Sequence, residues 1–211
     1  MKIAVGGTHS TGKTTFLSRL RHLLETAGYH VASVADQAAA ARDHGFPIMR
    51  EQTATTTLWI ITTGIAAELA AARRADIVLV DRPVTDALAY HLAAHAWRGQ
   101  PPDPVESEFL TDLARHHTPS YQLIYRTVPD PALGIRDDGH RDTDPAYRNL
   151  VDDAITTVHT RLHLSTVPLH STDHTTAVRK ALELALRTIP RPAPGPAARP
   201  DRPPPPPRPR R

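Results

Sequence analysis

Cysteine is absent from the 211-residue chain. Its absence excludes disulfides, thiolate zinc sites, iron–sulfur clusters and cysteine nucleophiles. Long hydrophobic runs are also missing, because the longest fall far short of the roughly 20 residues that a membrane span needs. The N-terminal run Met1–Val5 meets glycine too soon to be the apolar core of a signal peptide. We therefore expect a soluble, cytoplasmic protein with no membrane partner, of a length that suits one ordinary domain.

Most of the chain has no excess of positive charge, and the positive residues in excess lie at its C-terminal end. Residues 1–188 hold 19 lysines and arginines against 21 acidic residues, whereas residues 189–211 hold six arginines and one aspartate. Eleven of the 21 prolines also lie in that last stretch. A segment of this composition cannot build a core. We therefore expect a slightly acidic domain over residues 1–188 and a disordered Pro/Arg-rich tail over residues 189–211.

Short apolar runs alternate with helical patterns along residues 1–188. Strands are expected at residues 2–5, 30–34, 77–80, 121–125 and 167–170. Helices are expected at residues 14–27, 36–44, 51–74, 84–97, 106–116, 147–162 and 175–188, and residues 129–145 form a long loop. Apolar strands that alternate with helices are typical of a parallel sheet buried on both faces. The pattern predicts an α/β protein, a three-layer sandwich around a five-stranded parallel sheet.

Residues 7–14, with the sequence GTHSTGKT, satisfy the phosphate-loop pattern G-x-x-x-x-G-K-[ST] without a mismatch. The loop follows an expected strand and opens an expected helix, so its backbone N–H groups and the helix N-terminus face a polyphosphate. We expect Lys13 to contact the β- and γ-phosphates of ATP and the Thr14 hydroxyl to bind Mg²⁺. The His9 side chain either packs in the loop or takes part in catalysis. The expected nucleotide-binding residues are Gly7, Thr8, His9, Ser10, Thr11, Gly12, Lys13, Thr14 and Thr15.

A second acid near the metal is expected on a neighbouring strand. Asp81 directly follows the apolar run at residues 77–80, and the carboxyl end of such a strand opens into the ligand crevice. Arg82 comes next and can hold a phosphate or orient the acid by bidentate contacts. The alternative for this pair is a strand-end turn with a surface ion pair. On the first interpretation, Thr14 and Asp81 hold Mg²⁺ together.

Residues 81–90, DRPVTDALAY, give the pattern D-R-P-x-x-D-x-x-x-Y. With the phosphate loop, with Asp36 after the second expected strand and with the charged segment at residues 137–141, this pattern resembles the P-loop small-molecule kinases of the NadR-like (nicotinamide riboside kinase) AAA-type ATPase family. Thymidylate kinases and deoxynucleoside kinases are similar more distantly. The resemblance covers residues 1–188 in order. It implies a P-loop NTPase fold that uses ATP and Mg²⁺.

The same resemblance implies roles for single residues. Asp36 would contact the acceptor hydroxyl, and Asp81 with Arg82 would serve the metal. In the family the residue at the position of Asp36 is commonly Glu and is soon followed by Arg, whereas here the nearest arginine is Arg42, which leaves the acceptor open. Residues 136–144 would form a lid that excludes water and neutralises the γ-phosphoryl group, although a solvated turn is the alternative. The cations of this lid would be Arg136, Arg141 and Arg148, and the adenine would lie near residues 171–173.

Other candidate residues have a plainer interpretation beside the functional one. The pairs His91/His95 and His159/His163 have the spacing of zinc ligands on a helix but lack the glutamate of H-E-x-x-H, so we expect solvated helix faces. Four residues are either contacts for a base or nicotinamide ring, or residues of the core and its rim: Phe46, Gln52, Trp59 and Tyr90.

The sequence predicts a phosphotransferase that moves the γ-phosphoryl group of ATP to a small nucleoside- or nucleotide-like acceptor. Two alternatives stay open: an NTP-binding ATPase or switch without an acceptor, and a kinase for a natural product or modified nucleoside. The preference for ATP over GTP and the oligomeric state, a homodimer included, also stay open. The tail is either without function, or a ligand for an SH3-like domain, or an electrostatic tether to nucleic acid or acidic partners. Specific nucleic-acid recognition is not indicated, and nucleic acid is not the expected partner, because no aromatic residues are interleaved with the arginines of the tail.

Overall fold

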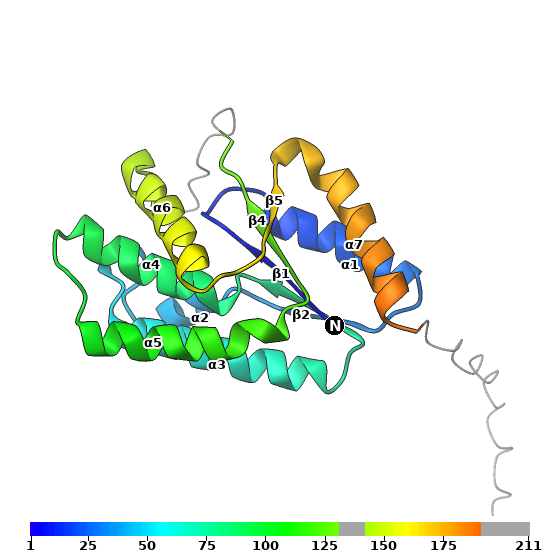
Figure 1. Ribbon diagram of the computed structural model, residues 1–211, viewed down its shortest axis with the longest axis horizontal. Coiled ribbons are helices and arrows are strands. Elements are labelled where there is room, and N and C mark those ends of the chain that lie inside the picture. The colour runs from blue at the N-terminus through cyan, green and yellow to red at the C-terminus, as the bar shows by residue number, and fades with distance from the viewer. Residues whose placement is uncertain (131–141, 191–211) are drawn as a thin grey trace, which may run out of the picture.

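A computed structural model describes residues 1–130 and 142–190 of the chain. Its strands are β1 (Lys2–Gly6), β2 (Val31–Val34), β3 (Ile77–Asp81), β4 (Leu123–Thr127) and β5 (Val167–Leu169). All neighbouring strands are parallel, in the order β2-β3-β1-β4-β5 (Figure 1). The expected five-stranded parallel sheet is therefore confirmed.

The helices also match the expected pattern, with shifts of a few residues at their ends. They are α1 (Lys13–Thr26), α2 (Gln37–Asp43), α3 (Ala54–Ala72), α4 (Val84–Trp97), α5 (Pro104–His117), α6 (Pro145–Arg161) and α7 (His174–Thr188). Three short 3₁₀ turns lie between them: η1 (Met49–Glu51), η2 (Thr118–Ser120) and η3 (Ser171–Asp173). Several helices begin where an aspartate accepts hydrogen bonds from the first free N–H groups, such as Asp103 before α5 and Asp144 before α6.

Alternate residues of each strand face opposite layers of the sandwich. In β1, Ile3 and Val5 pack with buried residues of α1 and α7, whereas Ala4 packs on the other face with residues of β2, β3 and β4. Figure 1 shows α1 and α7 together on one side of the sheet and α3 to α6 on the other. Burial on both faces explains why these strands are almost continuously apolar.

Helix α4 lies at the centre of the larger helical layer, packed against α3, α5 and α6. Its residues Leu88 and Ala93 belong to a buried cluster that also holds Ile61, Leu110 and Ile155 from the neighbouring helices. Since α4 starts at Val84, directly after the DRP turn, this core fixes the polar residues that the helix carries toward the phosphate loop.

Helix α3 corrects the expectation that no segment approaches a membrane span in length. Its 19 residues have a mean hydropathy of 1.2 and satisfy a length-and-composition test for a span. In the structure it packs against β2, β3, α2, α4 and α5. Apolar core helices pass the same test, so this finding is weak evidence for a membrane.

The register of the sheet brings the ends of four strands to one edge. Val5 of β1 is opposite Asp81 of β3, Gly6 is opposite Arg126 of β4, and Val34 of β2 is opposite Val80. The phosphate loop, the Asp36 turn and the DRP turn therefore leave the sheet side by side, as ligand-binding loops do in this class of fold. The expected lid residues 136–141 and nearly all of the expected tail, residues 191–211, lie outside the described residues.

Candidate active site at the carboxyl edge of the sheet

The phosphate loop joins β1 to α1 through two glycines with positive φ. Gly7 has φ 130° and Gly12, the N-cap of α1, has φ 83°. A Cβ atom on Gly7 would lie 2.0 Å from Thr127 Oγ1, so only glycine permits this close approach. Gly12 provides no side-chain cap, which leaves the first N–H groups of α1 free for a ligand.

Lys13 is folded back into the loop rather than extended into solvent. Its ammonium group donates hydrogen bonds to the carbonyl oxygens of Gly7 (3.2 Å) and Thr8 and to Thr11 Oγ1 (3.3 Å). Burial and the nearby charge of Arg82 lower the pKa of Lys13 to about 7. A bound polyphosphate would replace these neutral acceptors with charged ones and favour the ammonium form.

The two expected metal ligands lie in contact. Thr14 Oγ1 donates a hydrogen bond of 3.1 Å to Asp81 Oδ2, across the junction of α1 and β3. A hydroxyl and a carboxylate oxygen at this distance suit Mg²⁺, which binds through few protein oxygens and keeps several waters. Thr14 and Asp81 therefore have the donor chemistry for a Mg²⁺–nucleotide complex.

Arg82 links the phosphate loop to the Asp36 turn. Its Nε lies 2.7 Å from Asp36 Oδ2, and its Nη1 donates to the Gly7 carbonyl oxygen (2.7 Å) and to Asp86 Oδ2 (3.3 Å). Burial opposes its charge, but the fields of Tyr90, Asp36 and Asp86 outweigh burial and raise its pKa above the ordinary value. Its backbone has φ 72°, a conformation that costs a non-glycine residue free energy and concentrates at functional turns.

Asp86 is a site residue whose function the sequence analysis missed. It is 1% exposed, and its Oδ2 accepts a hydrogen bond of 2.9 Å from the Gly7 N–H group. Burial raises its pKa to about 6, against the opposing effects of Arg82 and of that hydrogen bond. The available signal was the spacing D-x-x-x-Y, because Asp86 and Tyr90 are four apart on α4 and therefore face the same side.

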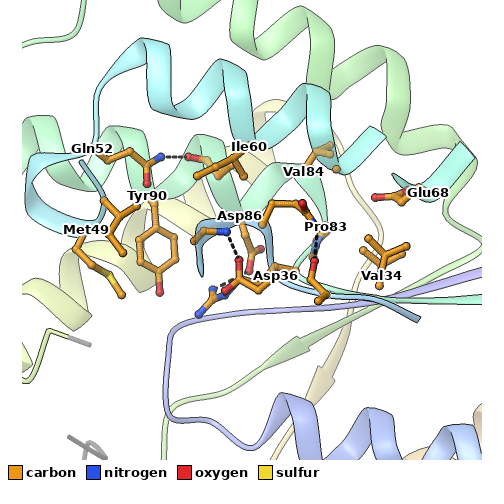
Figure 2. A pocket seen from close by; sticks show the side chains of 18 residues that line it. Val34, Asp36, Met49, Gln52, Ile60, Glu68, Pro83, Val84, Asp86 and Tyr90 are labelled. Carbon is orange, nitrogen blue, oxygen red and sulfur yellow. Dashed lines mark hydrogen bonds and ion pairs between the residues drawn. The ribbon is translucent and has the colours of Figure 1, made fainter. Parts of the chain in front are cut away.

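A largely apolar pocket opens beside Arg82 (Figure 2). It encloses about 590 Å³, counting the part open to solvent, between β2, the DRP turn, α3 and α4. Asp36 stands at this pocket and also caps α2 by accepting the Ala38 N–H (2.9 Å). The apolar lining residues include Val34, Ile48, Met49, Ile60, Val80 and Val84.

The candidate base-contacting residues divide at this pocket. Gln52 and Tyr90 line it, and the Gln52 amide is fixed by donating to Thr57 Oγ1 (2.9 Å) and to the Ala87 carbonyl oxygen (2.8 Å). Trp59 and Phe46 pack against each other, with ring centroids 5.4 Å apart, and do not line it. The structure thus places Gln52 and Tyr90 where a ligand could lie and leaves the other two rings in the core and its rim. Arg42 pairs with the adjacent Asp43 on the exposed end of α2.

A buried carboxylate, Glu68 of α3, closes one end of the pocket. It is 1% exposed and accepts hydrogen bonds from Lys2 Nζ (3.1 Å), Tyr121 Oη (2.8 Å) and, at 2.7 Å, His117 Nε2. The ion pair with Lys2 balances its charge inside the protein. This hydrogen-bond network joins α3 to β1 and to the end of α5, and it makes this end of the pocket rigid.

Two histidines expected on solvated helix faces are buried. His91 and His159 are almost inaccessible, because α4 and α6 pack these faces inward. Burial is the main cause that lowers the pKa of each to about 4, helped by His95 and Arg126 respectively. Across residues 1–130 and 142–190, no cluster of three or more potential metal-ligating side chains occurs.

The expected lid and adenine regions are described in part. Arg136 and Arg141 lie outside the described residues, so their roles stay predictions. Arg148 lies in α6 and is 8% exposed. Arg50 of η1 is paired with Asp142 and Asp144 and stacks on Trp97, so it ties the pocket rim to the chain before α6.

The η3–α7 junction borders the phosphate loop, as expected for the adenine neighbourhood. A Cβ atom on Gly12 would lie 3.0 Å from the His174 ring, which itself packs edge-on against Phe16. The role of residues 171–173 toward adenine stays a prediction.

Comparisons with known proteins agree with this architecture. A family model described as an AAA domain matches residues 2–176. Among solved structures, NadR protein in complex with NR superposes with a TM-score of 0.62 at 19% identity, covering 86% of this chain and 48% of that one. The deoxyadenosine kinase from M. mycoides with products dCMP and a flexible dCDP bound gives 0.58 at 14% identity, covering 89% and 97%. The chain thus spans about half the length of the NadR chain, and no curated protein gives a sequence match.

Proposed function

The chain belongs to this AAA domain family, and from that premise we propose that it is an ATP- and Mg²⁺-dependent kinase of a small nucleoside-like acceptor. One observation carries the proposal: the phosphate loop, with Thr14 and Asp81 in contact, shares Arg82 with a pocket that holds a carboxylate at its edge. An NTPase that only switches conformation has no need of an apolar pocket joined to its phosphate loop in this way. The fold shared with NadR and deoxyadenosine kinase adds support.

The charges of the pocket favour an acceptor hydroxyl over an acceptor phosphate. Its charged lining residues are Asp36, Glu68, Asp86 and Arg82. The guanidinium of Arg82 already binds both aspartates, and the charge of Glu68 is balanced by Lys2. Among the described residues, no lining cation remains to neutralise a second phosphate. We therefore expect an uncharged or cationic nucleoside-like molecule rather than a nucleoside monophosphate.

The chemistry of phosphoryl transfer depends mainly on position and on charge neutralisation. The loop N–H groups and Lys13 hold the phosphates, and Thr14 with Asp81 would hold Mg²⁺, which neutralises charge on the phosphate oxygens when bound. Asp36 orients the acceptor hydroxyl and accepts its proton. Arg82 keeps the Asp36 carboxylate and the Gly7 carbonyl in fixed relation, so the acceptor and the phosphate loop keep a constant separation.

The test is a measurement of acceptor-dependent ADP release. The purified chain is incubated with Mg²⁺-ATP and a panel of nucleosides, their 5′-monophosphates, nicotinamide riboside and modified nucleosides. We expect ADP release to rise with one or more nucleosides and not with the monophosphates. Lys13→Ala is expected to lose turnover by about 10²-fold or more while its thermal unfolding changes little, since the Lys13 contacts lie within the loop.

Three outcomes would change or narrow the proposal. ADP release that is equal with every acceptor and with none would favour the ATPase or switch alternative. A clear preference for monophosphates would show that the argument from the pocket charges is wrong. Release with a modified nucleoside alone would support the natural-product alternative and keep the site assignment.

A further inference from the structure

His9 of the phosphate loop is buried and contacts the proposed acceptor pocket. The residue is 2% exposed, and its Nδ1 lies 3.2 Å from the hydroxyl of Tyr90, which lines that pocket. Burial and the positive charges of Arg82 and Lys13 lower the pKa of His9 to about 4, so the ring is neutral near pH 7. A neutral imidazole has one nitrogen that donates and one that accepts.

The neighbours of Tyr90 decide which nitrogen donates. The Arg82 guanidinium lies 5.0 Å from the centre of the Tyr90 ring and hydrogen-bonds the Tyr90 hydroxyl. A guanidinium can only donate, so the hydroxyl oxygen accepts from Arg82. We assign the hydroxyl hydrogen to the contact with His9 Nδ1, because the buried hydroxyl then both accepts and donates. The hydrogen of the imidazole then resides on Nε2.

That Nε2–H group makes no well-aligned hydrogen bond among the described residues. A buried donor without a partner costs free energy, and in native proteins it calls for a ligand, a water or a functional reason. Nε2 points away from Tyr90. A poorly aligned hydrogen bond with the Asp142 backbone raises the pKa of the ring, and the nearby charge of Arg148 lowers it. Arg148 is itself buried, and its Nε and Nη2 also lack partners in the described part of the chain.

Two of the unpartnered groups are donors from different elements, His9 Nε2 of the phosphate loop and the Arg148 guanidinium of α6, whereas the unpartnered Asp86 Oδ1 can only accept and the Thr8 hydroxyl can do either. An anion suits an N–H donor together with a guanidinium better than a neutral acceptor does, because hydrogen bonds between charged partners are the stronger ones. The anion expected next to the phosphate loop is the terminal phosphoryl group of the bound nucleotide. A neutral acceptor hydroxyl would leave the guanidinium uncompensated.

We propose that the His9 side chain donates a hydrogen bond from Nε2 to the terminal phosphoryl group of the bound nucleoside triphosphate, and that Tyr90 is a positioning residue which fixes the donating tautomer. This inference deepens the proposed function and rests on it. Tyr90 also lines the acceptor pocket, so the same tyrosine contacts the acceptor and orients the His9 ring that donates to the phosphoryl group.

The experiment compares two nucleotides that differ by the terminal phosphoryl group. Affinities for ADP and for β,γ-imido-ATP are measured by calorimetry in the presence of Mg²⁺, for the parent chain and its variants. We expect His9→Ala to weaken β,γ-imido-ATP about ten- to a hundredfold, as for a hydrogen bond to a charged group, and ADP less than about twofold. His22→Ala, on the exposed face of α1, is the matched control and should change neither affinity.

Three more variants separate the hydrogen bond from packing. A Gln amide nitrogen reaches the position of the imidazole Nε2, so His9→Gln should recover most of the lost affinity, whereas the shorter His9→Asn should not. Tyr90→Phe keeps the ring and frees the tautomer, so it should weaken β,γ-imido-ATP by about three- to tenfold, again with little change for ADP.

The proposal is overturned if His9→Ala weakens both nucleotides equally or neither, or if His9→Asn restores binding as well as His9→Gln. Failure of the proposed kinase function is a separate result, because it is read from acceptor-dependent ADP release by the parent chain. A parent without that release, but with the selective loss in His9→Ala, would keep the hydrogen bond and discard the acceptor.

Discussion

The buried carboxylate of Asp86 should hold the phosphate loop in place before any ligand binds. In Asp86→Ala the Gly7 N–H group loses its acceptor at 2.9 Å, and Arg82 loses the weaker of its two ion pairs, at 3.3 Å. The Asp36 contact at 2.7 Å and the hydrogen bond to the Gly7 carbonyl oxygen remain, so the guanidinium keeps one ion pair. The substitution also creates a small cavity at a position that is 1% exposed.

The magnitude follows from these separate losses. An orphaned buried N–H costs about 1–3 kcal/mol, and breaking a buried ion pair costs about 3–5 kcal/mol when no second partner remains. Here the loss of the ion pair costs less, because Arg82 keeps its ion pair with Asp36. Burial raises the pKa of Asp86 to about 6, so removing this carboxylate also recovers part of its desolvation cost. We expect Asp86→Ala to lower the free energy of unfolding by about 2–3 kcal/mol. Asp86→Asn keeps an acceptor for Gly7 and should cost about 1 kcal/mol.

Urea unfolding of the nucleotide-free protein at pH 7, followed by circular dichroism, measures both variants. The control is Asp112→Ala, which removes an exposed acid of α5 paired with Arg115 and should change stability by less than about 0.5 kcal/mol. A loss below about 0.5 kcal/mol in Asp86→Ala would refute the reasoning. An equal loss in Asp86→Asn and Asp86→Ala would show that the charge of Asp86, and not its hydrogen bond to the loop, supports the site.

Three further predictions concern other parts of the molecule. In Gly7→Ala the new Cβ would lie 2.0 Å from Thr127 Oγ1 at a backbone φ of 130°, so we expect a loss of about 2 kcal/mol or more in the free energy of unfolding and weaker ADP binding. Urea unfolding and calorimetry measure these two effects, and a stable variant with the parent affinity would contradict the loop geometry. Glu68→Ala leaves the ammonium of Lys2 buried without its carboxylate, so we expect a loss of about 3–5 kcal/mol in the free energy of unfolding in the same assay. A loss below about 1 kcal/mol would contradict the role of this hydrogen-bond network. The pKa of His91 is about 4 in the folded protein against 6.5 for a free imidazole, so between these values the unfolded chain binds more protons and stability falls as the pH falls. His91→Gln should therefore lose less stability than the parent between pH 7 and pH 5. Equal losses would argue against a neutral buried ring.

The order of strands and helices could be predicted because each depends on local pattern. Lys2–Gly6 and Ile77–Asp81 are short apolar runs that end at glycine or at a charged turn, and such runs become central strands of a parallel sheet. The phosphate loop was equally clear, since glycine, lysine and threonine at fixed spacing serve one function. The contact of Thr14 with Asp81 also agrees with the sequence interpretation, although their role toward metal stays a prediction.

What the sequence did not reveal depends on packing between distant segments. His91 looked like a residue on a polar helix face, but α4 is covered by α3, α5 and α6, so no single-helix pattern could show its burial. The contact of His9 with Tyr90 joins residues 81 positions apart, and the contact of Gly7 with Asp86 joins residues 79 apart. Such pairs become visible only once the register of β1 against β3 is known.

Three cationic side chains lie around the phosphate loop, Arg82, Lys13 and Arg148, and they differ in how many of their present contacts a bound anion would have to replace. Arg82 already has four acceptors, in Asp36, Asp86, the Gly7 carbonyl and the Tyr90 hydroxyl, and a phosphate could reach it only by breaking one of these contacts. Lys13 binds neutral loop oxygens that a phosphate would replace with gain, and Arg148 has nitrogens without partners among the described residues. The sequence allowed Arg82 either to hold a phosphate or to orient an acid, and its partners favour the second. Under the proposed kinase function, Arg82 would therefore set the distance between the acceptor and the loop, while Lys13, Arg148 and His9 would respond to the nucleotide.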